Sequence, residues 1–154
     1  MQEEALDIYR DLGNRLGQAI AFLYLGNAQR LTGDYRAAAR ALEQALGIYR
    51  DIGDRGGEAE ALNERGTLYR VSGDLAHAEG CHHQALDLTR QIGLSWDEAH
   101  ALAGLGRCAQ AAGHNAEAEN KLRQALAIFR RIGAAEAADL LAELEALADA
   151  PPTT

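Results

Sequence analysis

The sequence predicts an all-α fold, a right-handed superhelical solenoid of antiparallel helix pairs with about eight helices. Three observations predict it. The chain of 154 residues contains 32 Ala, and its two Pro both lie in the last four residues. Ala loses no side-chain entropy in a helix, whereas Pro interrupts the backbone hydrogen bonds. Residue types also recur every forty positions, and Gly divides each unit into two segments with helical periodicity.

The forty-residue repeat is visible when the chain is written in rows of forty. One Gly column and one Arg column are complete over four rows, namely Gly13, Gly53, Gly93 and Gly133, and Arg10, Arg50, Arg90 and Arg130. Two further Gly columns are Gly26, Gly66 and Gly106, and Gly33, Gly73 and Gly113. A period of this length indicates stacked supersecondary units, each of which buries its apolar face against its neighbours.

Each complete repeat divides into two helices. In the first repeat, Ala19, Phe22 and Leu23 follow helical spacing. Gly33 supplies the left-handed conformation that ends a helix, and Asp34 is a good N-cap for the next one. The predicted pairs are 16–31 with 35–51, 56–71 with 75–91, and 96–111 with 115–131.

The two ends of the chain each match half a repeat. Residues 2–12 align with the second helices and residues 135–149 with the first, so they complete the eight helices of one predicted domain, 1–150. Ser95 with Glu98 predicts a capping box at the start of the third pair. Residues 151–154 are expected to form a frayed tail.

The column pattern resembles the tetratricopeptide repeat. That family has a bulky residue, then Leu-Gly three and four positions later, then a small-large-small series on the second helix. The residues that carry the likeness are Phe22, Leu25-Gly26, Ala38, Leu42 and Ala45, then Leu62, Arg65-Gly66, Ala78, His82 and Ala85, then Leu102, Leu105-Gly106, Ala118, Leu122 and Ala125. Arg65 and His82 stand at positions that are apolar in the family. The period is similar to that of a longer subclass found in scaffold adaptors and large bacterial regulators, since the family's usual period is about 34 residues.

The resemblance implies a non-enzymatic protein-interaction module. Its concave groove, lined by the first helix of each pair, would bind a peptide or helix of a partner protein. The chain would then be part of a larger cytoplasmic regulatory or scaffold protein. The expected groove residues are Ile20, Leu23, Asn27, Arg30, Glu60, Asn63, Thr67, Arg70, His100, Arg107 and Gln110.

Composition excludes several other classes of function. The net charge of −8 argues against a nucleic-acid partner, because such proteins carry a basic face. No apolar run of about 18 residues predicts a membrane span, and no secretory signal opens the chain. Cys81 and Cys108 make no disulfide framework and are expected to be reduced. No nucleophile with a neighbouring base indicates an enzyme.

Three arginines at or near one repeat position have two interpretations. Arg30 and Arg70 are forty residues apart, and Arg107 lies one helical turn from the equivalent place. They predict either a row of guanidinium groups for an acidic side chain or C-terminal carboxylate, or solvated charges paired with neighbouring acids. The family's carboxylate clamp uses Lys and Asn, and no Lys occupies these positions, so the clamp is not transferred.

One predicted helix carries a cluster of potential metal ligands. His77 and Cys81 share a helix face, but a closed zinc site needs about four ligands and no second cluster supplies them. We therefore predict no metal and no cofactor. His82, in a core column, is interpreted as a buried, neutral, hydrogen-bonded imidazole. Trp96 is interpreted as a plug over the connection between repeats, in preference to an exposed interface anchor.

Both ends of the chain carry apolar side chains without an obvious cover. These are Leu6, Ile8, Tyr9 and Leu12 at one end, and Leu140, Leu141, Leu144 and Leu147 at the other. Complete solenoids normally end in polar caps, so we expect a segment of a longer array. The alternative function is self-association as a homo-oligomer, or regulatory packing within one chain, through these end helices.

Overall fold

The computed structural model describes residues 2–149, without the side chains of residues 2–6 and 9. Within this range the chain is all-α, as predicted, and has no strand. The helices are α1 (Gln2–Leu31), α2 (Tyr35–Ile52), α3 (Arg55–Val71), α4 (Leu75–Ile92), α5 (Ser95–Ala111), α6 (Asn115–Ile132) and α7 (Glu136–Ala148). The bounds of α2 to α7 differ from the predicted ranges by at most one residue. The predicted tail, 151–154, lies outside the described residues.

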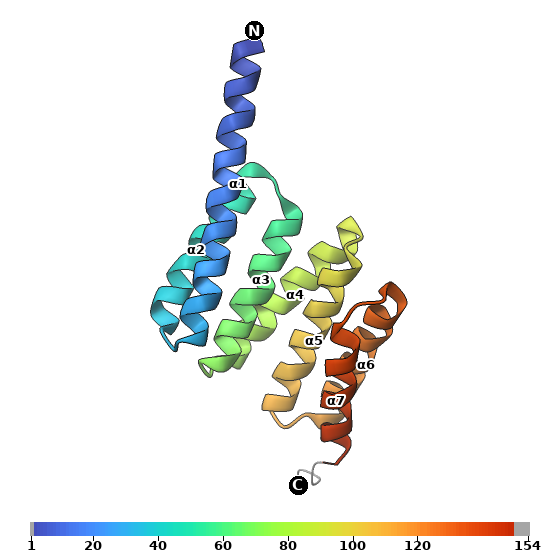
Figure 1. Cartoon of the computed structure of the whole chain (residues 1–154). Coiled ribbons are helices and arrows are strands. Elements are labelled where there is room, and N and C mark those ends of the chain that lie inside the picture. The colour runs from blue at the N-terminus through green and yellow to red at the C-terminus, as the bar shows by residue number, and fades with distance from the viewer. Residues whose placement is uncertain (1, 150–154) are drawn as a thin grey trace.

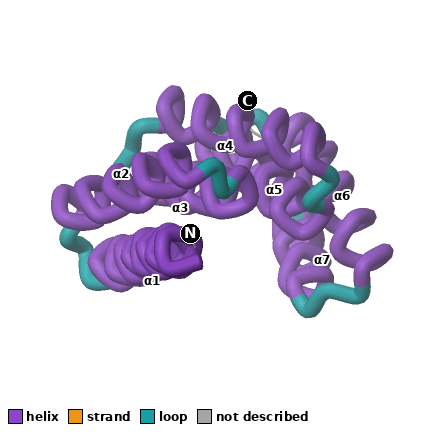
Figure 2. Tube along the Cα trace, turned by 90° about the horizontal axis from the view of Figure 1, so that it is seen from above, coloured by secondary structure: helices purple, strands orange, loops and turns teal. Residues whose placement is uncertain are grey.

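The helices form two curved layers. Three antiparallel pairs, α1 with α2, α3 with α4 and α5 with α6, follow one another along the chain, and α7 packs on α6 (Figure 1). Seen from above, α1, α3, α5 and α7 line the inner side of an arc, and α2, α4 and α6 form its outer side (Figure 2). The first helix of each pair therefore faces the concave surface.

Six glycines end the helices as the sequence predicts. Each of Gly33, Gly53, Gly73, Gly93, Gly113 and Gly133 has a positive φ. Asp34, Asp54 and Asp74 cap α2, α3 and α4 with their side chains.

The predicted Ser95–Glu98 capping box is wrong. The N-cap of α5 is Leu94, which offers no side-chain oxygen. Glu98 instead accepts a hydrogen bond from Nε of Arg90 at 3.1 Å, as Glu58 does from Arg50 at 3.0 Å. These two bridges explain part of the Arg column, because each one joins the end of a second helix to the next first helix.

The predicted break between residues 12 and 16 does not occur, so the described chain has seven helices in place of about eight. Gly13 is helical inside α1, whereas the equivalent Gly53 ends α2 with φ of 74°. The α2 turn is stabilised because α2 packs on α1 and α3. The first part of α1 instead projects from the body of the molecule (Figure 1), and Ile8 and Leu12 on it are exposed. A continuous helix, which adds one hydrogen bond per residue, is then the favoured conformation.

In the first and third pairs, a leucine of the second helix packs against a glycine of the first helix. A Cβ at Gly26 would lie 2.8 Å from Cγ of Leu42, and one at Gly106 would lie 2.9 Å from Cγ of Leu122. Only Gly permits this approach, which brings the paired helices together. In the second repeat His82 takes the place of the leucine, and this change builds the site described next.

A polar cavity on the concave face

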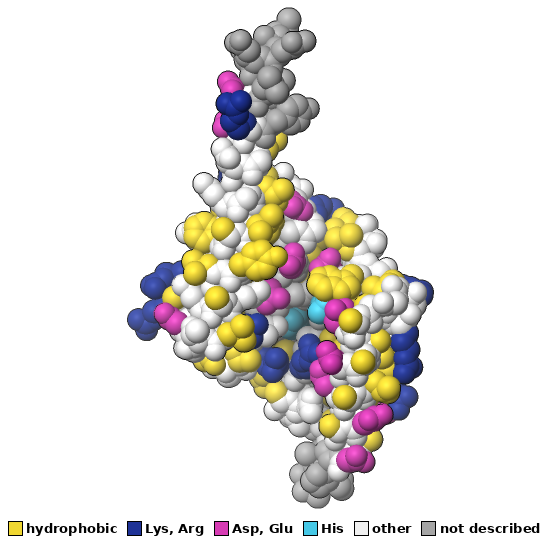
Figure 3. All heavy atoms as spheres, viewed as in Figure 1, with side chains coloured by type: hydrophobic (Ala, Val, Ile, Leu, Met, Phe, Trp, Pro, Cys, Tyr) yellow, Lys and Arg dark blue, Asp and Glu magenta, His cyan; other side chains and the backbone are white. Residues whose placement is uncertain are grey.

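A small cavity of ≈ 60 Å³ opens on the concave face between α3 and α5. It is lined by Glu60, Asn63, Glu64, Thr67, His82, Trp96, Asp97, His100, Gly104 and Arg107. The space-filling view of this face shows histidine side chains at the floor of a hollow, with acidic groups beside them and arginine or lysine groups below (Figure 3). Five of the predicted groove residues, Glu60, Asn63, Thr67, His100 and Arg107, therefore surround one cavity.

His82 reaches the cavity from the outer layer, between two glycines. Its side chain is 1% exposed. A Cβ added to Gly66 on α3, or to Gly104 on α5, would lie 2.5 Å from Nε2 of His82. The positions equivalent to Gly104 hold Tyr24 and Glu64, so the extra room for the imidazole comes from this one glycine.

The tautomer of His82 follows from its hydrogen bonds. Nδ2 of Asn63 donates to the backbone oxygen of Asp97 at 3.3 Å, which orients the amide so that Oδ1 faces His82. Nδ1 of His82 lies 3.0 Å from that oxygen and must carry the proton. Burial, with the nearby positive charges of Arg70 and Arg107, lowers the pKa of His82 to about 4. The ring is therefore neutral at pH 7, as predicted, and its Nε2 is a buried acceptor without a partner among the described residues.

Three carboxylates surround the cavity. Burial, followed by the charge of Glu60, raises the pKa of Asp97 to about 6. Burial also raises the pKa of Glu60 and that of Glu64, and Glu60 adds to the second shift. Neither Glu60 nor the side chain of Asp97 forms an ion pair or hydrogen bond within the described part of the chain. The charge of Glu60 thus repels both Asp97 and Glu64.

Trp96 forms one wall of the cavity. Its Nε1 donates to Oε2 of Glu136 on α7 at 2.8 Å, and its ring contacts His100 edge-on, with centroids 4.1 Å apart. His100 in turn packs against Phe129, and its Nε2 has no partner in residues 2–149. Because Trp96 is 44% exposed and lines the cavity, the plug interpretation is wrong.

Of the three predicted groove arginines, Arg70 and Arg107 line a second hollow beside the cavity, whereas Arg30 does not. Arg30 and Arg107 are paired with acids. Nη2 of Arg30 lies 4.0 Å from Glu64. Arg107 makes a bidentate contact with Glu143 of α7, at 3.1 and 2.7 Å. Arg70 forms no ion pair or side-chain hydrogen bond with any described residue, and its pKa is lowered by burial and by Arg107. Arg70, Arg107 and Gln110 line a shallow hollow of ≈ 480 Å³ next to the cavity. Arg30 and Arg107 are thus paired with neighbouring acids, as the second interpretation expects, and Arg70 is not.

The other predicted groove residues are divided between the surface and the core. Ile20 is 40% exposed on α1, and Asn27 is partly buried, with an unpartnered Oδ1. Leu23 is only 3% exposed and belongs to the core, because it packs inward from α1. Sequence reasoning missed Glu64, Asp97 and Gly104 as parts of the site.

The two ends of the chain differ in exposure. On α1, Ile8 is 60% and Leu12 is 42% exposed, while the side chains of Leu6 and Tyr9 lie outside the described residues. On α7, Leu140 and Leu147 are buried in the core and Leu144 packs partly against it. Leu141 is 39% exposed. The uncovered apolar surface therefore lies mainly on the projecting part of α1.

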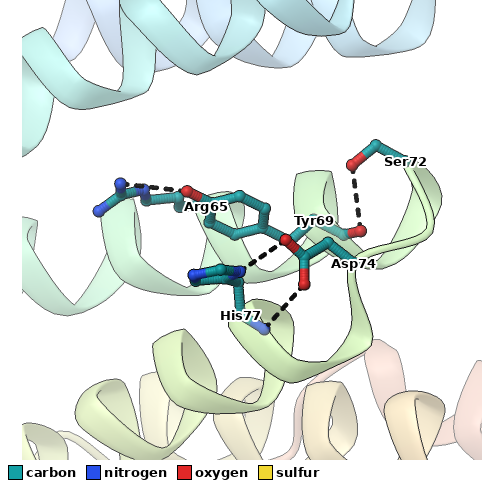
Figure 4. A network of polar contacts seen from close by, with 5 residues as sticks. All are labelled: Arg65, Tyr69, Ser72, Asp74 and His77. Atoms are coloured by element: carbon teal, nitrogen blue, oxygen red, sulfur yellow. Dashed lines mark hydrogen bonds and ion pairs between the residues drawn. The ribbon is translucent and has the colours of Figure 1, made fainter.

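His77 and Cys81, the potential metal ligands on α4, are held by contacts within the fold. Nδ1 of His77 lies 2.6 Å from Oδ2 of Asp74, and its ring stacks on Tyr69, whose hydroxyl accepts from Arg65 at 3.2 Å (Figure 4). Cys81 is buried, which raises the pKa of its thiol. Among the described residues no group of three or more His, Cys, Asp and Glu side chains is arranged to hold a metal ion. No helix in that part of the chain is both long and apolar enough to cross a bilayer.

Solved structures share this arrangement at low sequence identity. The apo form of RapI aligns with a TM-score of 0.76 and 15% identity, covering 86% of this chain and 37% of that one. BtubC from P. vanneervenii aligns with a TM-score of 0.78 and 22% identity, covering 94% and 60%. A putative kinesin light chain from Podospora anserina with TPR-like repeats aligns at 0.73 and 19% identity, covering 86% and 66%.

The chain thus spans less than two thirds of RapI and of BtubC. No curated protein matches the sequence. The sequence model of the tetratricopeptide-repeat family, however, matches residues 1–51 and 57–131, which is most of the chain. Together with the paired helices and their glycine contacts, this match shows that the chain belongs to the tetratricopeptide-repeat family.

Proposed function

We propose that the concave face binds an extended peptide or a helix of a partner protein, as part of a larger cytoplasmic regulatory or scaffold protein. The tetratricopeptide-repeat fold generally serves as a protein–protein interaction module. The observation that carries the proposal for this chain is the set of polar groups without partners on the concave face. Arg70, Asn27 and His82 each present at least one such group. Buried polar atoms are normally hydrogen-bonded, so a cluster of unpaired ones favours a missing ligand.

Arg70 gives the groove a preference for an acidic group. A half-buried guanidinium with no counter-ion gains more from a carboxylate than one that is fully solvated, because the local dielectric is lower. Arg107 lies beside it but is already paired with Glu143. The preferred segment would therefore present an acidic side chain, or its C-terminal carboxylate, to Arg70.

The test uses a displayed library of random peptides with the purified chain as bait. We expect enriched peptides with a carboxylate at a fixed place, and the variant Arg70→Glu should lose them. Arg36→Glu makes the same charge change on the outer helix α2, where Arg36 is exposed and unpaired in the described structure. It should retain all peptides. Equal loss in both variants, or no enrichment at all, would contradict the proposal.

Self-association is the second candidate, and the projecting part of α1 favours it. This segment leaves the body of the molecule (Figure 1), and it exposes Ile8 and Leu12 on the part of α1 that projects beyond the pair with α2. Exposed apolar side chains of this kind are typical of helix–helix interfaces. Light scattering over a concentration series should show dimers or larger species that Ile8→Glu with Leu12→Glu abolishes. A strict monomer at high concentration would rule this candidate out.

A further inference from the structure

We propose that the cavity between α3 and α5 binds the ammonium group of a lysine side chain in the partner segment that occupies the groove. This inference rests on the proposed function and names one specificity subsite within it. The arginine hollow prefers a negative group, whereas this neighbouring cavity has the opposite preference. The two share Arg107 as a common wall.

The floor of the cavity requires a hydrogen-bond donor. Nε2 of His82 is an acceptor, because Nδ1 carries the proton toward Asn63. The side chain is 1% exposed, lines the cavity and has no partner at Nε2. A carboxylate placed there would leave this acceptor unsatisfied and add repulsion. An N–H group satisfies it.

The charges around the opening require that donor to be cationic. Glu60 and Asp97 lie close enough to repel each other and have no counter-ion in the described chain. The one cation in the lining, Arg107, is held by both oxygens of Glu143. The cavity therefore carries uncompensated negative charge in a partly desolvated place, where attraction to a cation is stronger than at an open surface.

Size and the aromatic wall favour lysine over arginine. A cavity of ≈ 60 Å³ suits a compact ammonium with three donors, and its lining offers His82, Glu60 and Asp97 as acceptors. The planar guanidinium is broader. The exposed ring of Trp96 offers a surface for the methylene stem and a cation–π contact at the rim. A buried acceptor, two acids and an aromatic wall together make the site selective for a lysine side chain.

The chain itself provides the reporter for the test. Trp96 is its only tryptophan, so its fluorescence reports occupation of the cavity directly. The probes are acetylated, amidated pentapeptides of alanine with a central lysine, arginine, acetyl-lysine or glutamate. Acetylation removes the charge and two donors while it keeps the stem. We expect the lysine peptide to bind about tenfold more tightly than the acetyl-lysine peptide, which corresponds to one charge-assisted hydrogen bond. The arginine peptide should be intermediate, and the glutamate peptide should leave the fluorescence of Trp96 unchanged, because an acidic side chain would not enter the cavity.

Variants assign the binding to the cavity. Glu60→Gln and Asp97→Asn should each weaken the lysine peptide by about tenfold, whereas Glu43→Gln, an exposed and unpaired acid on α2, should leave it unchanged. Glu60 is exposed, so its replacement keeps the fold, which unfolding curves verify.

Two results would overturn the inference. One is no fluorescence change with the lysine peptide at millimolar concentration, which would mean that the cavity holds only water. The other is equal binding of the lysine and acetyl-lysine peptides. Either result leaves the proposed function intact if the library still enriches peptides that depend on Arg70, so the two failures can be told apart.

Discussion

The imidazole of His82 packs against Gly104 so closely that a β-carbon at residue 104 would overlap the ring. The two residues belong to different repeats and different layers. Each departs from its own column, since the leucines Leu42 and Leu122 stand where His82 does and Tyr24 and Glu64 stand where Gly104 does. The two departures compensate each other sterically, and together they place a polar acceptor at the base of the concave face.

Gly104→Ala should lower the free energy of unfolding by about 2 kcal/mol, because the new methyl group overpacks the ring. Gly80→Ala, at a helical glycine with no atom near its Cβ position, should instead raise it by about 1 kcal/mol. Urea unfolding curves measure both.

The same pair gives a double-mutant cycle. His82→Leu removes the ring, so the penalty for alanine at residue 104 should shrink by about 1 kcal/mol or more in that background. Additive effects of the two substitutions would contradict the proposed coupling.

His82 should make the fold sensitive to acid. Its pKa is about 4 in the folded chain and 6.5 when solvated, so the unfolded chain binds a proton first as the pH falls. Stability is therefore fully present above about pH 6.5 and decreases toward pH 4, by an order of 3 kcal/mol in all. His82→Leu should flatten this part of the profile, whereas His114→Gln at an exposed turn should not. Thermal unfolding between pH 7 and pH 4 tests it, and parallel curves for all three proteins would refute it.

Asp97 should have the opposite pH dependence. Its pKa is raised in the folded chain, from 3.8 to about 6, so ionisation is harder in the folded state than in the unfolded state. Its contribution to the free energy of unfolding is greatest below about pH 3.8 and is lost as the pH rises through 6. Asp97→Asn should therefore exceed the wild type in stability at pH 7 by about 1 kcal/mol, a figure reduced for solvent screening. The difference should vanish near pH 4.

Asp87→Asn, at an exposed position of α4, is the matched control and should change little. A less stable Asp97→Asn at pH 7 would show that Asp97 acts mainly as an N-terminal charge for α5. If the expected gain is found together with weaker lysine binding, the carboxylate is retained for binding at a cost in stability.

Gly13 and Gly53 occupy the same repeat position but adopt different backbone conformations. This difference allows a test of whether α1 is continuous through residue 13. Gly13 lies inside a helix with open space around its Cβ position, and Gly53 has φ of +74°. Gly13→Ala should therefore increase helicity and slow amide exchange in α1, in line with a gain of about 1 kcal/mol. Gly53→Ala should destabilise the fold by 1–2 kcal/mol or so, the usual cost of a left-handed non-glycine residue. If Gly13→Ala destabilises as Gly53→Ala does, the chain turns at residue 13.

The repeat made most of the fold predictable. Forty-residue columns of Gly and Ala fix where helices end and which faces meet, so α2 to α7 follow from local signals alone. The fusion of residues 2–12 with the next helix could not follow from the column pattern, because Gly13 looks like Gly53. The difference comes from what packs beside each turn, which is a tertiary effect.

The candidate site was only half predictable. The helix face that carries Glu60, Asn63, Arg70 and His100 follows from the repeat register. Gly104 could have been found from the sequence. It is a glycine where the other repeats have larger residues, and His82 is a histidine where they have leucine, so the small residue could make room for the polar ring. The raised pKa of Asp97 and the pairing of Arg107 with Glu143 depend on distances between helices, which periodicity does not specify.

The most direct test of the account is a map of where a peptide binds. A library-selected peptide titrated into isotopically labelled protein should shift the amide signals of α1, α3, α5 and α7, and the indole signal of Trp96, while those of the outer helices α2, α4 and α6 stay in place. Shifts confined to the outer helices or to the projecting part of α1 would contradict the claim that the concave face is the binding surface.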